Sequence, residues 1–314
     1  MGGIVVIGSL NMDLVVRAEH MPAPGETVRG QGFRTVPGGK GANQAAAIAL
    51  LGGQVAMVGR VGYDAFGPRL IENMAAKGVN TQHIIVDQDV ATGIAMIIVD
   101  AAGENSIVIA SGANGRVSPR DIDACDDLLR QSRYLVLQFE IPLETVAYAI
   151  EKAARYGLQV ILNPAPATTF PREMLKGVHY LVPNETEAQL LTGQAVHDLP
   201  SAERTARLLH EQGARVVIIT LGEKGALAVT DQEIFHIAAP KVNVVDTTAA
   251  GDAFIGGLVV GLSQGLPLKE AARYAVCAGS LAVTRFGAQT SLPSADEVRS
   301  LYSRCSCFSK HHKA

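Results

Sequence analysis

The sequence predicts an α/β fold in which a mostly parallel sheet is flanked by helices on both faces. Short runs of β-branched residues alternate with Ala- and Leu-rich stretches of helical length along most of the 314 residues. Several of the short runs are apolar throughout, which is typical of strands that are covered on both faces. Glycines follow most of the helical stretches, at the positions where helices are usually capped.

The elements follow one another in a regular order. Strands are expected at 4–7, 55–58, 134–137, 159–162, 180–182 and 216–220. Helices are expected at 42–51, 67–77, 143–156, 186–191, 202–212, 251–262 and 268–284. The expected capping glycines are Gly52, Gly78, Gly157, Gly213 and Gly265.

Two stretches interrupt the alternation and predict a small β layer beside the sheet, such as a lid. Residues 12–38 contain several Gly and Pro and lack a helical period, and residues 91–110 have the pattern of two strands joined by a polar turn. The lid is therefore expected as an insertion in a core that covers residues 1–300. Residues 301–314 are expected to form a disordered tail.

Composition excludes several classes of protein. Hydrophobic residues make up 48% of the chain and charged residues 18%, a balance that fits a packed enzyme and argues against disorder. With a net charge of −3 and no run of Lys or Arg, no nucleic-acid partner is expected. The apolar runs are too short for a membrane span, and the N-terminus has the pattern of a strand rather than a signal peptide. Four cysteines without metal-binding spacing indicate reduced thiols and a cytoplasmic location.

The sharpest functional signal is the run Asp-Thr-Thr-Ala-Ala-Gly-Asp from Asp246 to Asp252, at the start of a predicted helix. Main-chain amides at a helix start form an anion hole suited to a phosphoryl group, and Asp252 is suited to accept a proton from an attacking hydroxyl. A simpler interpretation is that an acidic residue stabilises the first helical turn, by roughly 0.3–1 kcal/mol. That interpretation explains neither the second aspartate nor the small residues.

A glycine-rich run at 37–44, Pro-Gly-Gly-Lys-Gly-Ala-Asn-Gln, leads directly into another predicted helix. Its glycines allow main-chain N–H groups to approach a ligand closely, although a tight turn explains them almost as well. The run matches neither a Walker loop nor a dinucleotide-binding loop.

Polar residues also follow several predicted strands, where open α/β sheets bind their ligands. Asn11, Asp13 and Glu140 have amide and carboxylate groups that suit sugar hydroxyls, with turn formation or solvent exposure as the simpler explanation. Asn184 and Glu187 have the spacing of a capping box, which the spacing alone favours over a role near Mg²⁺ and phosphate.

The segment from 220 to 225 is compatible with a loop around a nucleotide or with a plain hairpin turn. These two interpretations remain open from the residues alone.

Six segments taken together resemble the ribokinase family of carbohydrate kinases. They occur in the family's order and span the chain from about residue 4 to 293. The segments are Asn-Met-Asp at 11–13, Gly-Gly-Lys-Gly-Ala-Asn-Gln at 38–44, Asn-Pro-Ala-Pro-Ala at 163–167, Pro-Asn-Glu-Thr-Glu at 183–187, Asp-Thr-Thr-Ala-Ala-Gly-Asp at 246–252 and Val-Thr-Arg-Phe-Gly-Ala-Gln at 283–289. The third and the last look more like the ribose-phosphorylating members than like the fructose or adenosine kinases.

The resemblance implies a doubly wound, ribokinase-like α/β core with a β lid, and ATP-dependent phosphorylation of D-ribose at O5 with Mg²⁺. It implies Asp252 as the base and Gly251, Ala250 and Ala249 as the anion hole. The implied sugar-binding residues, besides Asp252, are Asn11, Asp13, Gly39, Lys40, Gly41, Asn43 and Glu140. The implied nucleotide-binding residues are Asn184, Thr220, Leu221, Gly222, Glu223, Lys224, Gly225 and Gly251, with Glu187 acting on Mg²⁺ through water.

The resemblance also implies a monovalent-cation site for K⁺ and a homodimer formed through the lids. The matching cation-site residues are Asp246, Thr248, Ala282, Arg285, Gly287 and Ser291. Two alternatives to a ribose kinase stay open: a kinase of the same fold for 2-deoxyribose, another furanose or a nucleoside, and a sugar sensor without catalysis. A sensor would have no use for the proposed base.

Overall fold

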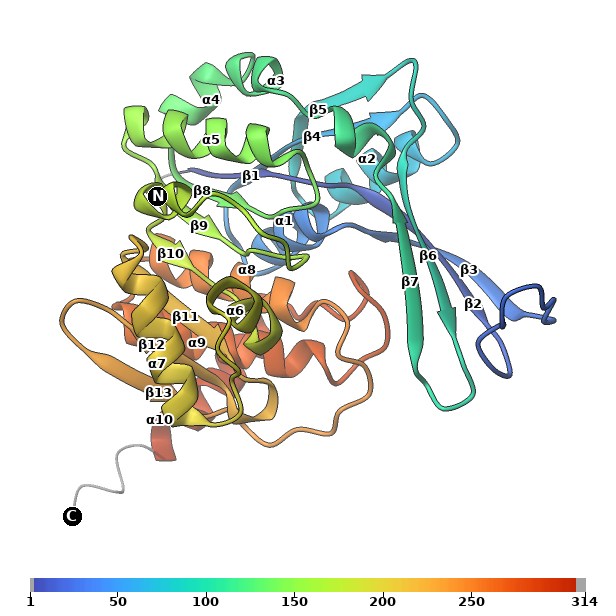
Figure 1. Ribbon diagram of the computed structural model, residues 1–314. Helices are drawn as coiled ribbons and strands as arrows, with labels where there is room; N and C mark the ends of the chain where they lie inside the picture. Colours follow the sequence, from blue (N-terminus) through green and yellow to red (C-terminus); the bar gives the residue numbers. More distant parts are fainter. Residues whose placement is uncertain (1–2, 309–314) are drawn as a thin grey trace.

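The computed structural model describes residues 3–308, and its core is one nine-stranded sheet (Figure 1). Across the sheet the strands are β13 (Ile234–Ile237), β12 (Ala226–Val229), β11 (Val216–Thr220), β10 (Tyr180–Leu181), β9 (Gln159–Leu162), β8 (Ser132–Leu137), β1 (Gly3–Ile7), β4 (Val55–Gly62) and β5 (Asn80–Asp87). All neighbours from β11 to β5 pair in parallel, whereas β12 and β13 form an antiparallel edge. This is the mostly parallel sheet that the apolar strands predict.

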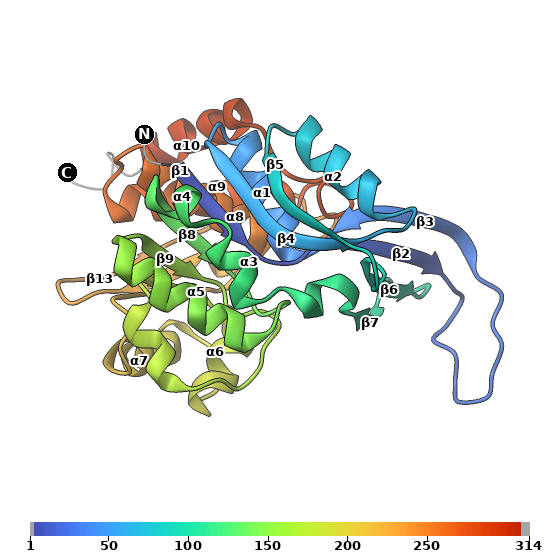
Figure 2. The same ribbon diagram turned by 90° about the horizontal axis from the view of Figure 1, so that it is seen from above.

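Helices cover both faces of the sheet, so the doubly wound arrangement is confirmed (Figure 2). One face carries α1 (Lys40–Leu50), α2 (Gly67–Ala76), α8 (Ala250–Ser263), α9 (Leu268–Ala282) and α10 (Ala295–Phe308). The other carries α3 (Pro119–Asp123), α4 (Asp126–Arg130), α5 (Leu143–Tyr156), α6 (Glu185–Thr192) and α7 (Leu199–Glu211). Alternate residues of β1 belong to the two cores, Ile4 and Val6 to the first and Val5 and Ile7 to the second. Strands buried on both faces therefore need an unbroken apolar sequence.

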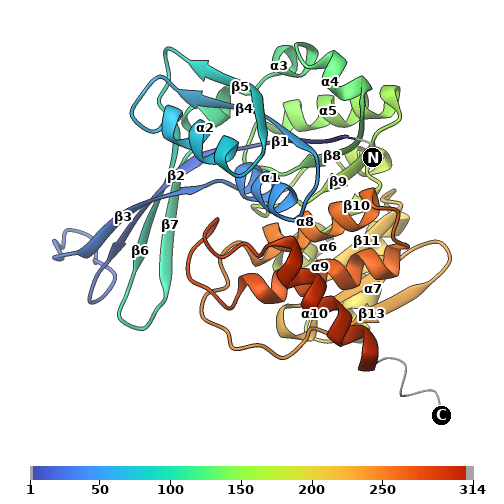
Figure 3. The same cartoon turned by 180° about the vertical axis from the view of Figure 1, so that it is seen from behind.

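The helix α8 is apolar and buried along almost its whole length because it lies between α1 and α9 (Figure 3). It begins at Ala250, one residue before the predicted start. The five glycines expected to cap helices all have left-handed φ angles, from 74° at Gly157 to 127° at Gly213. The expected helix at 268–284 ends slightly earlier, at Ala282.

A second sheet of four strands projects from the core and is built from the two interrupting stretches (Figure 1). Its order is β3 (Gln31–Gly38), β2 (Asn11–Arg17), β6 (Gly93–Val99) and β7 (Asn105–Ala110). β2 pairs antiparallel with β3 and parallel with β6, so that Asn11 lies opposite both Gly38 and Gly93. β1 and β2 are separated by only three residues, and the chain therefore passes directly from the main sheet into the second one.

The expectation of a disordered tail from residue 301 is wrong for 301–308, because α10 continues to Phe308. Val298 and Leu301 are buried, and the Tyr302 hydroxyl group donates a hydrogen bond to Glu270 of α9. The Tyr302 ring also packs edge-on against Tyr274, with 5.9 Å between ring centroids. Apolar contacts on one face of α10 thus outweigh its polar composition; residues 309–314 of the expected tail lie outside the described part of the chain.

Several elements lack a clear sequence signal, among them β5, β12, β13, α3 and α4. The segment from 220 to 225 contains a short 3₁₀ turn, Gly222–Lys224, between the antiparallel strands β11 and β12. The segment therefore forms a hairpin, and its contact with a nucleotide stays a prediction. Within the described residues, no helix is both long and apolar enough to span a membrane.

Candidate active site

Asp252 lies in the first turn of α8 and is only 6% exposed. Its Oδ2 atom accepts a hydrogen bond from Nδ2 of Asn43 at 3.0 Å, and its Oδ1 atom accepts one from Nε2 of Gln44 at 2.9 Å. The two donors are consecutive residues of α1, which packs beside α8. Each carboxylate oxygen is therefore held by its own amide donor.

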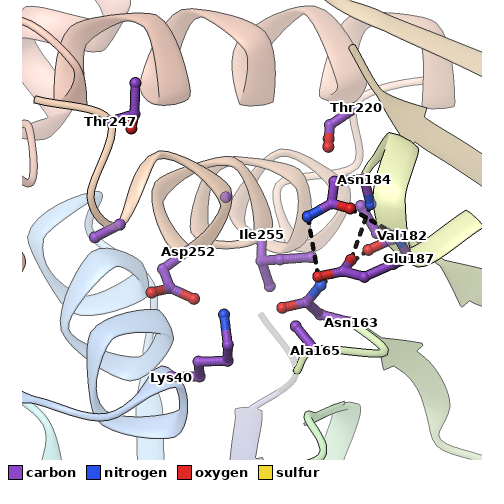
Figure 4. Close-up of a pocket in the computed structure, with 12 residues that line it drawn as sticks. Lys40, Asn163, Ala165, Val182, Asn184, Glu187, Thr220, Thr247, Asp252 and Ile255 are labelled. Atoms are coloured by element: carbon purple, nitrogen blue, oxygen red, sulfur yellow. Dashed lines mark hydrogen bonds between the residues drawn. The ribbon is translucent and has the colours of Figure 1, made fainter. Parts of the chain in front are cut away.

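Burial is the main influence on the pKa of Asp252 and raises it. The positive charge of Lys40 and the hydrogen bonds from Gln44 and Asn43 act in the opposite direction, and the charge of Glu140 raises the pKa further. Figure 4 shows the Lys40 side chain pointing toward the Asp252 carboxylate. A buried carboxyl with a raised pKa and matched donors has the character of a general base.

The N-terminus of α8 has no side-chain cap among the described residues. The N-cap residue, Ala249, adopts a left-handed conformation with φ 59° and ψ 10°, which an alanine rarely does. Strained backbone of this kind persists where the surrounding structure requires it and is frequent at functional sites. The free N–H groups at this end, together with the helix dipole, favour an anion beside Gly251.

A cavity of about 180 Å³ opens beside these residues. It lies at the carboxyl ends of the parallel strands, where open α/β sheets place their ligands. The lining residues are Lys40, Asn163, Ala165, Val182, Asn184, Glu187, Thr220, Thr247, Ala249, Gly251, Asp252 and Ile255 (Figure 4). The structure thus brings the implied base, the implied anion hole and part of the implied nucleotide site to one cavity.

The implied sugar residues adjoin the base from the side of the second sheet. The Oε2 atom of Glu140 accepts hydrogen bonds from the Ser9 hydroxyl group at 2.5 Å and from the Lys40 main-chain N–H at 3.0 Å. The Gly41 N–H donates to the Ser9 Oγ atom at 3.3 Å. Gly39 has a φ of 90°, and a Cβ atom there would lie 2.7 Å from the main-chain nitrogen of Asn11. The glycine-rich run therefore brings the start of α1 against the end of β1.

Asp13 and Asn11 lie on β2, the strand by which the chain enters the second sheet. Burial, followed by the negative charges of Glu140 and Asp252, raises the pKa of Asp13 to about 7. Asn11 is buried, and its Oδ1 atom accepts a hydrogen bond from Nδ2 of Asn114 at 2.7 Å. Asn114 also bonds both main-chain groups of Leu10, so it fixes the point where the chain enters the second sheet.

On the opposite side of the cavity, Asn184 and Glu187 form the capping box that their spacing favours. The two Glu187 carboxylate oxygens accept from the N–H and the Nδ2 of Asn184 at 2.9 and 3.0 Å. Burial raises the pKa of Glu187, and both residues line the cavity. The capping box does not exclude a ligand role, because the two side chains face the cavity that the implied base also lines (Figure 4).

Of the implied nucleotide loop, only Thr220 belongs to the cavity wall among the described residues. Leu221 is buried, whereas Glu223 and Lys224 are exposed on the short turn that follows. The Lys224 Nζ atom donates to the main-chain oxygen of His197 at 2.8 Å, which ties the turn to the segment before α7. The cavity wall therefore does not include the other five implied residues of this loop, which are Leu221, Gly222, Glu223, Lys224 and Gly225.

Two loops beside the anion hole contain the implied cation site. The Oδ1 atom of Asp246 accepts from the N–H and the hydroxyl group of Thr248, and its Oδ2 atom accepts from the Gly287 N–H at 2.8 Å. Burial would raise the pKa of Asp246, but these hydrogen bonds outweigh it and lower the pKa. The Asp246 carboxylate thus joins the loop before α8 to the loop after α9.

The other implied cation residues lie at the end of α9 or on the loop after it: Ala282 is the last residue of the helix, and Arg285 and Ser291 follow on the loop. The Ser291 hydroxyl group donates to the main-chain oxygen of Ala288 at 2.8 Å, and the Ala282 main-chain oxygen accepts from the Arg285 N–H. The Arg285 guanidinium pairs with Glu297 of α10 and has no acceptor atom, so only main-chain oxygen at this residue suits a cation. Among the described residues no cluster of three His, Cys, Asp or Glu side chains is arranged to hold a metal ion.

The family model of pfkB carbohydrate kinases matches residues 1–295. The chain belongs to this family. The observed ribokinase-like fold and the match agree with the resemblance seen in the motifs, which is thereby confirmed together with the enzyme class.

Relatives of this pfkB kinase are similar over nearly their whole length. The ribokinase of Schizosaccharomyces pombe is 42% identical, with 94% of the chain and 96% of the relative covered. The deoxyribokinase of Salmonella typhi is 41% identical with the same coverage of both chains. Among solved structures, Arabidopsis thaliana ribokinase complexed with ribose and ATP has a TM-score of 0.89 at 33% identity, covering 96% of the chain and 98% of that structure.

The motifs assign no role to five polar residues that surround the sugar side and the base of this pfkB kinase. They are Ser9, Gln44, Asn114, Gln138 and Asn163. Gln44 and Asn163 belong to motif segments and Gln138 precedes Glu140, so their neighbours mark them. Asn114 has no comparable signal, because its partners Leu10 and Asn11 are more than a hundred residues away along the chain.

Proposed function

We propose that the chain is an ATP-dependent ribose kinase that transfers the γ-phosphoryl group of ATP to O5 of D-ribose. The observation that carries this proposal is the Asp252 carboxylate, which lies buried beside an uncapped helix N-terminus at the wall of the cavity. A proton acceptor and an anion-binding backbone in contact with one cavity are what phosphoryl transfer to an alcohol requires. The ribokinases among the relatives support the same reaction.

The proposed reaction is one in-line displacement. Asp252 accepts the proton of the O5 hydroxyl group as the bond from O5 to the γ-phosphorus forms. The bond from the γ-phosphorus to the bridging oxygen breaks, and ADP leaves with that electron pair. N–H groups at the start of α8 and the Lys40 ammonium group face the negative charge that develops on the phosphoryl oxygens.

The sugar is proposed to bind between Asp252 and the second sheet. Asn11, Asp13 and Asn43 present amide and carboxylate groups on that side, and Glu140 holds the Lys40 main chain. A polar group that faces a missing hydroxyl is left without a partner, so Asp13 favours ribose over 2-deoxyribose. 2-Deoxyribose is the second candidate, because the Salmonella typhi deoxyribokinase is as similar as the ribokinases.

The nucleotide is proposed to occupy the cavity between α8 and Thr220, with its phosphates toward Gly251 and Asn184. Glu187 fits an indirect role toward Mg²⁺, because its oxygens already accept from Asn184 and can accept further from water. When bound, Mg²⁺ neutralises charge on the phosphates and positions them.

We also propose that K⁺ binds beside Asp246. The carboxylate, the Thr248 hydroxyl group and nearby main-chain oxygens supply the hard oxygen atoms that suit a large monovalent ion. When bound, the ion holds the loop before Gly251 in place.

The cytoplasmic location is proposed from the cysteines, of which Cys125, Cys277 and Cys305 are free thiols.

The second sheet is proposed as a lid and as the dimer interface. All residues of its edge strand β7 are exposed, including Ile107, Val108 and Ile109, with Val108 at 68%. An exposed apolar edge strand can pair with a strand of another chain. In a two-fold symmetric dimer, β7 of one copy would pair with β7 of the other.

The proposal is tested by ATP turnover with D-ribose, 2-deoxyribose, fructose, arabinose and adenosine. Ribose is expected to have the highest kcat/KM, with phosphorus NMR locating the new ester at O5. ATP turnover with none of these acceptors would contradict the kinase proposal and favour a sugar sensor.

A further inference from the structure

Gln44 is fully buried and makes hydrogen bonds with every hydrogen-bonding atom of its side chain. Its Nε2 atom donates to Oδ1 of Asp252 at 2.9 Å and to Oδ1 of Asn163 at 3.1 Å. Its Oε1 atom accepts from Nε2 of Gln138 at 2.6 Å. An amide has two N–H donors, and here one of them is directed to the proposed base.

The neighbours of Gln44 allow only one orientation of its amide. A reversed amide would place the Gln44 oxygen against the Asp252 carboxylate and its nitrogen against the nitrogen of Gln138. Asn163 is itself fixed, because its Nδ2 atom donates to the main-chain oxygen of Val182 at 3.0 Å. Gln138 and Asn163 therefore direct the Gln44 N–H group toward Asp252.

The same network is not optimised for stability. Oε1 of Gln138 is buried and has no hydrogen-bond partner among the described residues. A Cβ atom on Gly8 would lie 2.1 Å from this oxygen. The glycine at this position, the first residue after β1, therefore makes room for the Gln138 amide. Buried unsatisfied acceptors are uncommon in native proteins and call for an explanation. Orientation of Gln44 supplies one.

We propose that Gln44 is a positioning residue that holds the ionised Asp252 carboxylate toward the sugar hydroxyl, with Gln138 keeping Gln44 in its donating orientation. This inference rests on the proposed kinase function with Asp252 as base. Among the described residues, the hydrogen bonds of Gln44 to the cavity wall go only to Asn163 and Asp252, so it acts through the base and not on the sugar itself.

The charged groups that act on Asp252 remain when Gln44 is changed. Lys40 favours the ionised base, and the charges of Glu140, Asp13 and Glu187 interact unfavourably with it. Loss of the Gln44 donor removes a hydrogen bond that only the ionised form accepts well. The pKa of Asp252 then rises, and the fall of kcat on the acid side occurs at higher pH.

The test compares Gln44→Met, which has similar length and no donor, with wild type in kcat and KM from pH 5.5 to 9. Gln44→Met is expected to lower kcat at pH 7 about 10–100-fold, the worth of one hydrogen bond to a charged group, with the ribose KM changed less than about threefold. The acid limb, which is the fall of kcat at low pH, is expected at higher pH in this variant. Part of the lost kcat therefore recovers as pH rises. A packing defect alone would not recover with pH.

Two further variants keep the test decisive. Gln138→Met is expected to shift the acid limb in the same direction by a smaller amount, and it serves if Gln44→Met does not fold. Thr145→Val removes a buried side-chain hydrogen bond, to the Val117 main-chain oxygen at 2.8 Å, far from the base; it is expected to lower thermal stability without moving the limb. An equal shift in Thr145→Val would overturn the inference.

The two proposals fail differently. A wild type that phosphorylates none of the sugars contradicts the kinase function. An active wild type whose acid limb and kcat are retained in Gln44→Met and Gln138→Met contradicts only the role of Gln44.

Discussion

The Nδ2 atom of Asn43 lies 3.0 Å from the Oδ2 atom of Asp252, although 209 positions separate the two residues in the chain. This bond joins the glycine-rich start of α1 to the small-residue start of α8. It leaves the carboxylate buried, oriented and in reach of the cavity.

Asp252→Asn is expected to lower kcat about 10²–10⁴-fold, which is the usual contribution of a positioned base. Asparagine keeps the shape of the side chain, so ribose binding measured by calorimetry is expected to change much less. The control is an unchanged circular dichroism spectrum. Retention of wild-type kcat would remove Asp252 from the mechanism.

Ribose is expected to exceed 2-deoxyribose in kcat/KM by roughly 10–100-fold, since a polar group that loses its partner costs about 1–3 kcal/mol. Asp13 is the residue expected to contact the secondary hydroxyls. Initial rates over a range of each sugar at saturating ATP provide the measurement. Equal or better use of 2-deoxyribose would redirect the assignment to that sugar and leave the kinase function intact.

Asp13→Asn is expected to alter how stability depends on pH. The Asp13 pKa is raised from 3.8 to about 7, so the folded state holds a proton there that the unfolded state releases near pH 4. The free energy of unfolding therefore falls as pH rises from about 4 to 7. The free energy of unfolding of the variant minus that of wild type should be larger at pH 8 than at pH 4, by on the order of 1–3 kcal/mol. Both proteins are measured by urea denaturation without ligands. A pH-independent difference would contradict the raised pKa.

K⁺ is expected to raise kcat when it replaces choline at constant ionic strength, with Na⁺ much weaker. Asp246→Ala should abolish the rise, because the Asp246 carboxylate joins the two loops beside the anion hole. Asp198→Ala is the matched control, since Asp198 caps α7 away from the cavity. If K⁺ does not change the kcat of the wild type, the cation site is contradicted, and Asp246 only joins the two loops by hydrogen bonds.

Val108→Lys is expected to convert a dimer into a monomer in light scattering at micromolar concentration, because it introduces a charge into the exposed apolar edge strand β7. Leu190→Lys is the control, as Leu190 is an exposed apolar residue of α6 outside the second sheet. A monomeric wild type would contradict the dimer and leave the lid unaffected.

Much of the fold follows from local sequence. Strands covered on both faces must be apolar, and the run of four aliphatic residues at 216–219 is an example. The capping box of Asn184 and Glu187 is visible in the sequence because the two residues are only three positions apart. Asp252 stands out because its run combines two aspartates with small residues at the start of a helix, which is more than capping alone requires.

Other features depend on contacts that no local pattern records. α10 is held by Leu301 and Tyr302 against α9, and the intervening polar residues conceal this apolar face. The bonds of Gln44 to Asp252 and Gln138 span 208 and 94 positions. A glutamine in a helix has many possible partners, so its role is visible only once the two helices are packed.

The direct passage from β1 into β2 bears on how new sugar specificities arise. Asn11 and Asp13 belong to β2, and Asn114, in the short 3₁₀ helix Gly112–Arg116 that follows β7, fixes Asn11. A chimaera that exchanges the second sheet between relatives therefore exchanges residues of the proposed sugar site as well. Crossover points between residues 11 and 114 would separate Asn11 from Asn114, whereas exchange of the whole interval would keep this pair together and transfer the proposed sugar contacts and the proposed dimer edge in a single step.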